Sequence, residues 1–442
     1  MPNTAKRMSI VALTWPIFIE VLLRTALNTS DVFMLSSYSD KAVSAIGVVT
    51  QISFFLLIVS SMVSSGSSIL IAQYLGAGNK EKTHQVNVAS FVLALGVGVI
   101  LSLFACFSAF YLLPFLSLEA EVLSYAKEYL VISGSFTFVV TFGVVISTIM
   151  RCHGYSKSPM IINLIAGVIN LIGNYIALYQ PFGLPVYGVS GVAMATVVSQ
   201  IVSTLLLFAM LRYCSIPLKL AQYRLIPKAV YKKIVKIGAL NAGEVLSYNM
   251  AQITIMYFVI SMGTASVAAY TYAQNIARIA FAFSLALGQA TQIQTGYYIG
   301  KQYIDEIWQR VQWYFVAGFI VSVLMMGLFY LCRFSILSIF TQDPEIIQLT
   351  AALIGASIFL EAGRAFNLVF ISALKASGDI KFPVKMGIIS MWGIGVVMSY
   401  ILGIHWSMGV LGAWIAIAMD EWFRGLIMVR RWRSKIWLQF KL

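Results

Sequence analysis

Twelve apolar runs of about 20 residues or more follow one another along this chain, and they restrict its possible folds severely. A helix of that length crosses a hydrocarbon core about 30 Å thick. Inside lipid, every backbone N–H and C=O must be bonded within the protein, so these runs are expected to be α-helices. Their predicted limits are 9–36, 44–73, 86–115, 126–150, 158–180, 188–213, 233–262, 265–298, 308–332, 346–374, 382–404 and 408–429. The sequence therefore predicts an all-α membrane protein with twelve transmembrane helices.

Composition excludes a soluble globular fold. The 442 residues are 60% hydrophobic and 10% charged, whereas soluble chains carry roughly 25% charged residues. The sequence also contains no nucleophile–base motif, no metal-ligand spacing and no phosphate-binding glycine loop. We therefore expect a protein that is not an enzyme, needs no cofactor, and draws its energy from an ion gradient.

The second half of the chain repeats the first at an offset of 224 residues. Glu20-Val21-Leu22 recurs as Glu244-Val245-Leu246, and the register still holds where Gly154, Lys157 and Pro159 match Gly378, Lys381 and Pro383. Such an internal repeat is typical of secondary transporters. It predicts two six-helix lobes, residues 1–213 and 233–442, joined by a basic cytoplasmic linker at 214–232.

The basic residues predict the orientation in the membrane. Twenty-three Lys and Arg lie at the termini and in the even-numbered connections, against three in the odd-numbered connections, namely Lys41, Lys127 and Arg333. Positively charged connections remain in the cytoplasm, so both termini are expected there and the two lobes form a parallel repeat. The net charge of +14 then reflects membrane orientation, and no nucleic-acid partner is expected.

Ionisable residues inside a membrane are costly and become functional candidates by default. The predicted spans hold six acids and four bases: Glu20, Asp31, Glu244, Glu361, Asp420, Glu421, Arg24, Arg278, Arg364 and Arg424. Residues three or four apart share a helix face and can neutralise each other. Arg24, Arg364, Asp420 and Arg424 are therefore predicted to form structural or gating charge pairs, which leaves Glu20 and Glu361 open between a static pair and an ion-coupling role.

Asp31 and Glu244 have no basic residue within one helical turn. A desolvated carboxylate without a fixed counter-charge favours a proton or another cation as its partner. Both residues are predicted to couple transport to an ion, with a pair across helices, for instance between Glu244 and Arg278, as the alternative.

Polar side chains also mark the helix faces expected to line an interior cavity. Glu20, Arg24, Asn28 and Asp31 follow one stripe along the first span, and a lipid-facing stripe of this kind could not be satisfied. The predicted substrate-cavity residues are Asn28, Gln51, Asn170, Asn174, Tyr248, Gln274, Arg278 and Asn367. Single amides are also common as hydrogen-bonding links between helices, which remains the alternative for these positions.

Several segments resemble the multidrug and toxic compound extrusion (MATE) family. They are Thr14-Trp15-Pro16, Thr29-Ser30-Asp31-Val32-Phe33-Met34, Ala72-Gln73-Tyr74-Leu75-Gly76-Ala77-Gly78, Asn170-Leu171-Ile172-Gly173-Asn174 and Ser372-Ala373-Leu374-Lys375-Ala376-Ser377-Gly378-Asp379. The resemblance covers essentially the whole chain. It implies two lobes that alternate between inward- and outward-open states and export amphipathic compounds in exchange for protons or sodium.

The same resemblance places Asp31 at the family's coupling carboxylate. The chain departs from the family where Asn174 replaces a frequent Asp, and where Tyr248 and Arg364 align with the acids of the sodium-linked branch. The sequence thus predicts a monomeric, proton-coupled antiporter of the plasma membrane for small, often cationic compounds. Sodium coupling and a flippase for a lipid-linked precursor are the alternatives.

Overall fold

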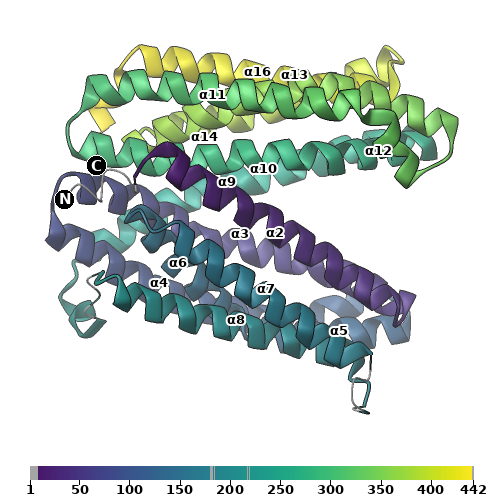
Figure 1. Cartoon of the computed structure of the whole chain (residues 1–442), viewed down its shortest axis with the longest axis horizontal. Helices are drawn as coiled ribbons and strands as arrows, with labels where there is room; N and C mark the ends of the chain where they lie inside the picture. Colours follow the sequence, from purple (N-terminus) through teal and green to yellow (C-terminus); the bar gives the residue numbers. More distant parts are fainter. Residues whose placement is uncertain (1–7, 180–182, 184, 217, 219, 441–442) are drawn as a thin grey trace. The chain divides into compact units, whose positions relative to one another are not determined.

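The computed structural model describes residues 8–179, 183, 185–216, 218 and 220–440, without the side chains of Asn28 and Ala221. Over these residues the chain is almost entirely helical and contains no strand (Figure 1). Four of the basic residues counted above at the termini and in the even-numbered connections lie outside the described residues, namely Lys6, Arg7, Lys219 and Lys441. The predicted all-α fold class is confirmed.

The first half of the chain forms seven of the labelled helices. They are α2 (Ile10–Ser36), α3 (Asp40–Gly76), α4 (Lys80–Phe107), α5 (Ala120–Ser135), α6 (Thr137–Cys152), α7 (Lys157–Leu178) and α8 (Gly188–Tyr213). The fourth predicted span, 126–150, is broken: α5 and α6 meet at an angle of 47° next to Phe136. Hydropathy alone cannot reveal such a bend, because the residues on both sides of it are apolar.

The second half forms the remaining helices. They are α9 (Lys228–Ser261), α10 (Thr264–Gly300), α11 (Ile304–Leu331), α12 (Arg333–Phe340), α13 (Pro344–Ser377), α14 (Lys381–Ser390), α15 (Val397–Tyr400) and α16 (Gly409–Arg433). Residues 381–405 form one apolar span that is interrupted by π-helical turns at Met391–Val396 and Ile401–His405.

Nine described helices are long and apolar enough to cross a membrane, or ten when α5 and α6 count as one bent span. Helices α9 and α16 fall outside this group because charged residues interrupt their apolar runs, notably Glu244 in α9 and Arg424 beside two acids in α16. Both are nonetheless long helices at the predicted positions, so the described helices agree with the twelve-span prediction.

Contacts divide the chain into two compact units. The first contains residues 19–71 and 79–242, and the second contains residues 9–18, 72–78 and 243–442. In the second unit, Tyr270 of α10 packs edge-to-face on the fully buried Trp414 of α16, with ring centroids 5.2 Å apart. A second aromatic cluster stacks Trp432 on Trp437 at 4.4 Å. These aromatic contacts anchor α16 to the rest of its unit.

Within the second unit, α10 meets the last turns of α3 at two glycines. A Cβ added to Gly76 would lie 2.0 Å from the carbonyl oxygen of Tyr297, and one added to Gly300 would lie 2.1 Å from that of Gln73. At the 224-residue offset, Gly300 is the counterpart of Gly76, and Tyr297 is the counterpart of Gln73. The contact is therefore reciprocal, and absent side chains allow the two backbones to touch, as small residues do in membrane helix pairs.

We expect Gly76→Ala to destabilise the protein by about 1–3 kcal/mol, because the new Cβ would overlap rigid backbone atoms. The melting temperature of the purified protein in detergent measures the loss. Gly96→Ala in α4 is the matched control, since its Cβ would meet no atom within 4 Å. Equal melting temperatures for the two variants would contradict a close backbone contact at Gly76.

Candidate ion-coupling sites

Asp31 lies in the last third of α2, in the first unit, where it is half-buried. The amide nitrogen of Asn174, on α7, donates a hydrogen bond of 2.6 Å to Oδ1 of Asp31. Asn174 is fully buried. The ion pairs of the described residues do not include Asp31. A neutral amide, and no basic side chain, is thus the recorded partner of this carboxylate.

The hydrogen bonds continue from Asp31 into the first unit. The Asn174 nitrogen also reaches Oδ1 of Asn170 at 3.4 Å, and the Asn170 nitrogen donates to Oγ1 of Thr196, on α8, at 3.2 Å. The phenol of Tyr129, from α5, lies beside Thr196 and Asp31. Among the described residues, the buried Oδ1 of Asn174 has no hydrogen-bond partner. Three helices, α5, α7 and α8, therefore place neutral polar groups near the carboxylate of Asp31, one of which is an unused acceptor.

Glu20 and Glu244 form the same ion pair in the two repeats. Nη2 of Arg151, in the last turn of α6, lies 2.5 Å from Oε2 of Glu20, and Lys375, in the last turn of α13, contacts Oε2 of Glu244. Both pairs are separated by 131 residues in the chain. The repeat thus preserves an interhelical ion pair inside each unit.

Glu244 consequently has a basic partner that its own helix does not supply. The partner expected across helices was Arg278, which is exposed and forms no ion pair among the described residues. Glu20 is held further by Asn163, whose amide donates to it at 2.8 Å. Gly387 takes the position of Asn163 in the second repeat, and its Cβ would lie 3.1 Å from Glu244. The second pair therefore lacks the supporting amide of the first.

A third charged site lies between α13 and α16 in the second unit. Nη1 of Arg364 lies 2.5 Å from Glu361, and Nη2 of Arg424 lies 2.6 Å from Asp420 and 2.9 Å from Glu421. The predicted pairs within each helix are therefore present. Nε of Arg364 also approaches Glu421 at 3.7 Å, which joins the two helices into one cluster. All three acids are buried.

This cluster is not electrically balanced. Three carboxylates face two guanidinium groups, so full ionisation leaves one excess negative charge. Neutral donors supply part of the difference: Asn367 donates to Glu421 at 2.9 Å, and Ser390 donates to Asp420. Oε2 of Glu361 is buried and has no hydrogen-bond partner within the described part of the chain. The arrangement can be neutralised by one bound proton.

A small cavity adjoins the same cluster. Its volume is about 10 Å³, which is the space of a single water molecule, and it is lined by Tyr248, Ala251, Gln252, Ile255, Met391, Gly395, Ile417 and Asp420. A water at this position would reach Asp420 and the polar groups of α9.

The predicted cavity residues separate into different groups. Asn170 and Asn174 join Asp31, and Tyr248 and Asn367 join the second-unit cluster. Gln51 and Arg278 are exposed, and Gln274 is half-buried. The side chain of Asn28 lies outside the described atoms. The sequence reasoning missed Arg151, Asn163, Thr196, Lys375 and Ser390. A signal existed for two of them, because Arg151 and Lys375 occupy matching positions in the repeat.

The chain is similar to known transporters over nearly its whole length. Residues 16–176 and 242–401 match the MatE family. The chain is 36% identical to the uncharacterized transporter YisQ of Bacillus subtilis, over 98% of this chain and 96% of that protein. It is 26% identical to a probable multidrug resistance protein NorM of Thermotoga maritima, over 98% and 93% of the two chains.

Solved structures share the fold. An outward-facing multidrug resistance MATE family transporter of the MOP superfamily superposes with a TM-score of 0.87 at 22% identity, covering 97% of this chain and 95% of the other. A MOP superfamily transporter from Pyrococcus furiosus gives the same score at 21% identity and the same coverage. With the family match over both repeats and the charged residues set inside apolar helices, this chain belongs to the MATE family of multi-pass membrane transporters.

Proposed function

We propose that this protein exports small amphipathic, cationic compounds from the cell in exchange for protons, and that Asp31 carries the coupling proton. Multidrug resistance relatives support efflux as the activity. The observation that favours Asp31 is its pairing with the neutral amide of Asn174 and with no basic side chain among the described residues. A mobile cation is the natural partner of such a carboxylate.

Asn174 is well suited to both protonation states of Asp31. An amide offers a donor and an acceptor. Its nitrogen bonds the ionised carboxylate, and its oxygen, which has no partner here, can accept from the protonated acid after a turn of the side chain. A second carboxylate at this position would add a negative charge beside Asp31. The amide therefore favours a site that binds one proton.

In the proposed cycle, Asp31 is ionised while a cationic compound is bound from the cytoplasm. The lobes then expose the cavity to the outside, where a proton neutralises Asp31 and removes its attraction for the cargo. The repeat supports two lobes, 1–213 and 233–442, with the linker 214–232 between them. The excess of bases in even-numbered connections supports cytoplasmic termini in a plasma membrane protein.

The second-unit cluster is a further candidate for proton binding. Its excess carboxylate is buried, and Glu361 retains an oxygen without a partner. Glu20 and Glu244, by contrast, each contact a basic side chain from another helix, which favours a structural role for both. Sodium coupling is the alternative for Asp31. A flippase for an anionic precursor is less well supported, because the buried second-unit cluster is formally negative.

Asp31→Asn should abolish concentrative efflux, since an amide cannot take up or release the coupling proton. The measurement uses everted vesicles with a pH-reporting dye: wild-type protein should dissipate the pH gradient when a cationic substrate is added, and the variant should not. Glu345→Gln is the matched control, as an exposed acid without a recorded ion pair. Substrate export that requires a sodium gradient and leaves the pH gradient intact would reverse the choice of ion.

Glu244→Gln should lower stability without changing the ion dependence, because it leaves the largely buried Lys375, whose side chain is 13% exposed, without its carboxylate partner. Breaking a buried pair costs about 3–5 kcal/mol, whereas replacing both members is far less costly. The double variant Glu244→Gln with Lys375→Met should therefore recover most of the melting temperature. A stable single variant with altered proton or sodium dependence would instead show that Glu244 takes part in coupling.

Glu361→Gln should reduce the pH dependence of stability. If the folded cluster holds one proton, the wild-type protein loses stability as rising pH removes that proton, and the variant has no third carboxylate to ionise. Melting temperatures between about pH 6 and pH 9 in detergent measure the slope. Glu345→Gln should keep the wild-type slope, and an unchanged slope in Glu361→Gln would exclude the cluster as a proton site.

A further inference from the structure

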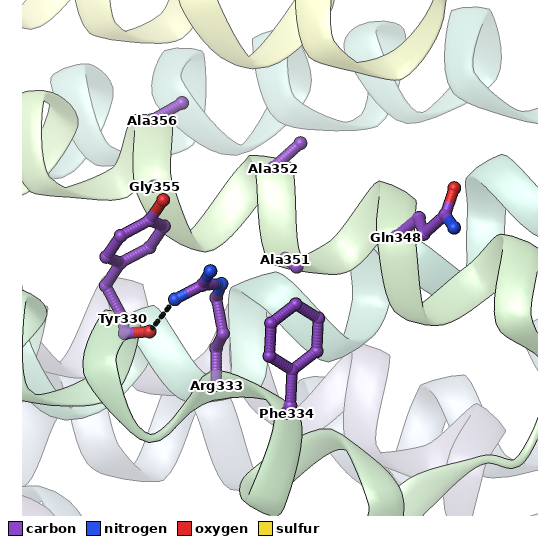
Figure 2. A pocket seen from close by; sticks show the side chains of 8 residues that line it. All are labelled: Tyr330, Arg333, Phe334, Gln348, Ala351, Ala352, Gly355 and Ala356. Atoms are coloured by element: carbon purple, nitrogen blue, oxygen red, sulfur yellow. Dashed lines mark hydrogen bonds between the residues drawn. The ribbon is translucent and has the colours of Figure 1, made fainter.

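A cavity of about 310 Å³ lies in the second unit at the end of α11, apart from all the charged sites described above. Figure 2 shows the side chains that line it. Tyr330, Arg333 and Phe334 form one side, at the junction of α11 and α12, and residues of α13 form the other: Gln348, Ala351, Ala352, Gly355 and Ala356.

Arg333 is the charged group of this cavity. Its guanidinium lies over the rings of Tyr330 and Phe334, at 4.0 Å and 4.4 Å from their centroids, and Nη1 donates to the carbonyl oxygen of Tyr330 at 2.7 Å. Among the described residues no carboxylate forms an ion pair with it. Lys41, on another odd-numbered connection, is paired with Glu119 and Glu121. Arg333 is therefore held in place by aromatic rings while its charge remains uncompensated.

The opposite wall is shaped by small residues on α13. Ala351, Ala352, Gly355 and Ala356 occupy successive turns of one helix face. A Cβ added at Gly355 would lie 3.0 Å from the ring of Tyr330, so a larger residue there would press against that ring. These small side chains form an apolar wall opposite the cationic group.

The cavity lies at a level of α11 and α13 that corresponds to the predicted edge of the hydrocarbon core. The predicted spans 308–332 and 346–374 place Arg333 just outside one span and Gln348 just inside the other. The neighbouring Leu331 and Phe334 are 78% and 53% exposed, which indicates a face turned to lipid. Arginine and aromatic side chains commonly lie at this level of a membrane.

We propose that this cavity binds the phosphate of an anionic membrane phospholipid. Arg333 contacts the phosphate oxygens, since guanidinium groups match phosphate geometry and retain further N–H donors after the bond to Tyr330. Gln348 can donate to the ester or glycerol oxygens, and one acyl chain follows the alanines of α13. The bound lipid would hold α11, α12 and α13 together. The proposal does not depend on the transported compound or on the coupling ion.

The test uses the full-length protein, stripped of lipid in a neutral detergent. Phosphatidylglycerol should raise the melting temperature by on the order of 5 °C when present about 100-fold above its dissociation constant. Phosphatidylcholine, inorganic phosphate and glycerol 3-phosphate are the comparison ligands. A rise with phosphatidylglycerol alone supports the proposal. An equal rise with phosphatidylcholine, or the full rise with inorganic phosphate, would overturn it.

Two variants separate the charged and the apolar parts of the site. Arg333→Met should lose the response to phosphatidylglycerol, and Ala352→Leu should reduce it at least tenfold in apparent affinity by crowding the apolar wall that the acyl chain follows. Lys127→Met is the matched control, because Lys127 lies over the Phe110 ring at 4.4 Å and does not line the cavity. If neither variant folds, native mass spectrometry of the wild-type protein decides: selective retention of phosphatidylglycerol supports the site, and equal retention of both lipids refutes it.

Discussion

Charge inside an apolar helix must be neutralised by the protein itself, and in this chain equivalent ion pairs do so in the two repeats. Glu20 bonds Arg151 in the first unit, and Glu244 bonds Lys375 in the second, with the same separation in sequence. Each pair ties the first span of a repeat to the last turn of its fourth span. Because both glutamates are thus occupied, a mobile ion must be sought at other carboxylates. The repeated pair therefore distinguishes Glu20 and Glu244, which have basic partners, from Asp31, which has none among the described residues.

The two repeats share this framework and differ in the polar groups built upon it. Ile255 stands at the position of Asp31 in the second repeat, so the first-unit carboxylate has no counterpart there. Conversely, Thr137 and Val140 stand where the second repeat has Glu361 and Arg364. Backbone contacts such as the Gly76 and Gly300 pair remained reciprocal. Duplication thus retained the packing, while each unit gained its own charged site.

Much of this could be predicted from sequence, and the limits have physical causes. Apolar runs located the helices, and the spacing of three or four residues identified the Glu361–Arg364 and Asp420–Arg424 pairs, because such pairs depend only on one helix. The bend at Phe136 and the partners of Glu244 depend on packing between helices, which hydropathy does not describe. The repeat could have indicated Lys375 as a partner of Glu244, since Arg151 occupies the equivalent position relative to Glu20. The excess of one carboxylate over the guanidinium groups in the second-unit cluster depends on the contact between α13 and α16, which the sequence of either helix alone does not show.

Under the proposed exchange of protons for cationic compounds, the unbalanced cluster would determine whether transport moves net charge across the membrane. Exchange of one proton for one monovalent cation moves no net charge, so the membrane potential contributes nothing and only a pH difference drives export. A second proton, bound near Glu361, would make the exchange electrogenic. One charge moving down 100 mV supplies about 2.3 kcal/mol, and at a factor of ten per 1.4 kcal/mol this sustains roughly a 40-fold gradient. In the proposed cycle, Asp31 alone would couple export to pH, whereas the use of membrane potential would require both units to take up a proton.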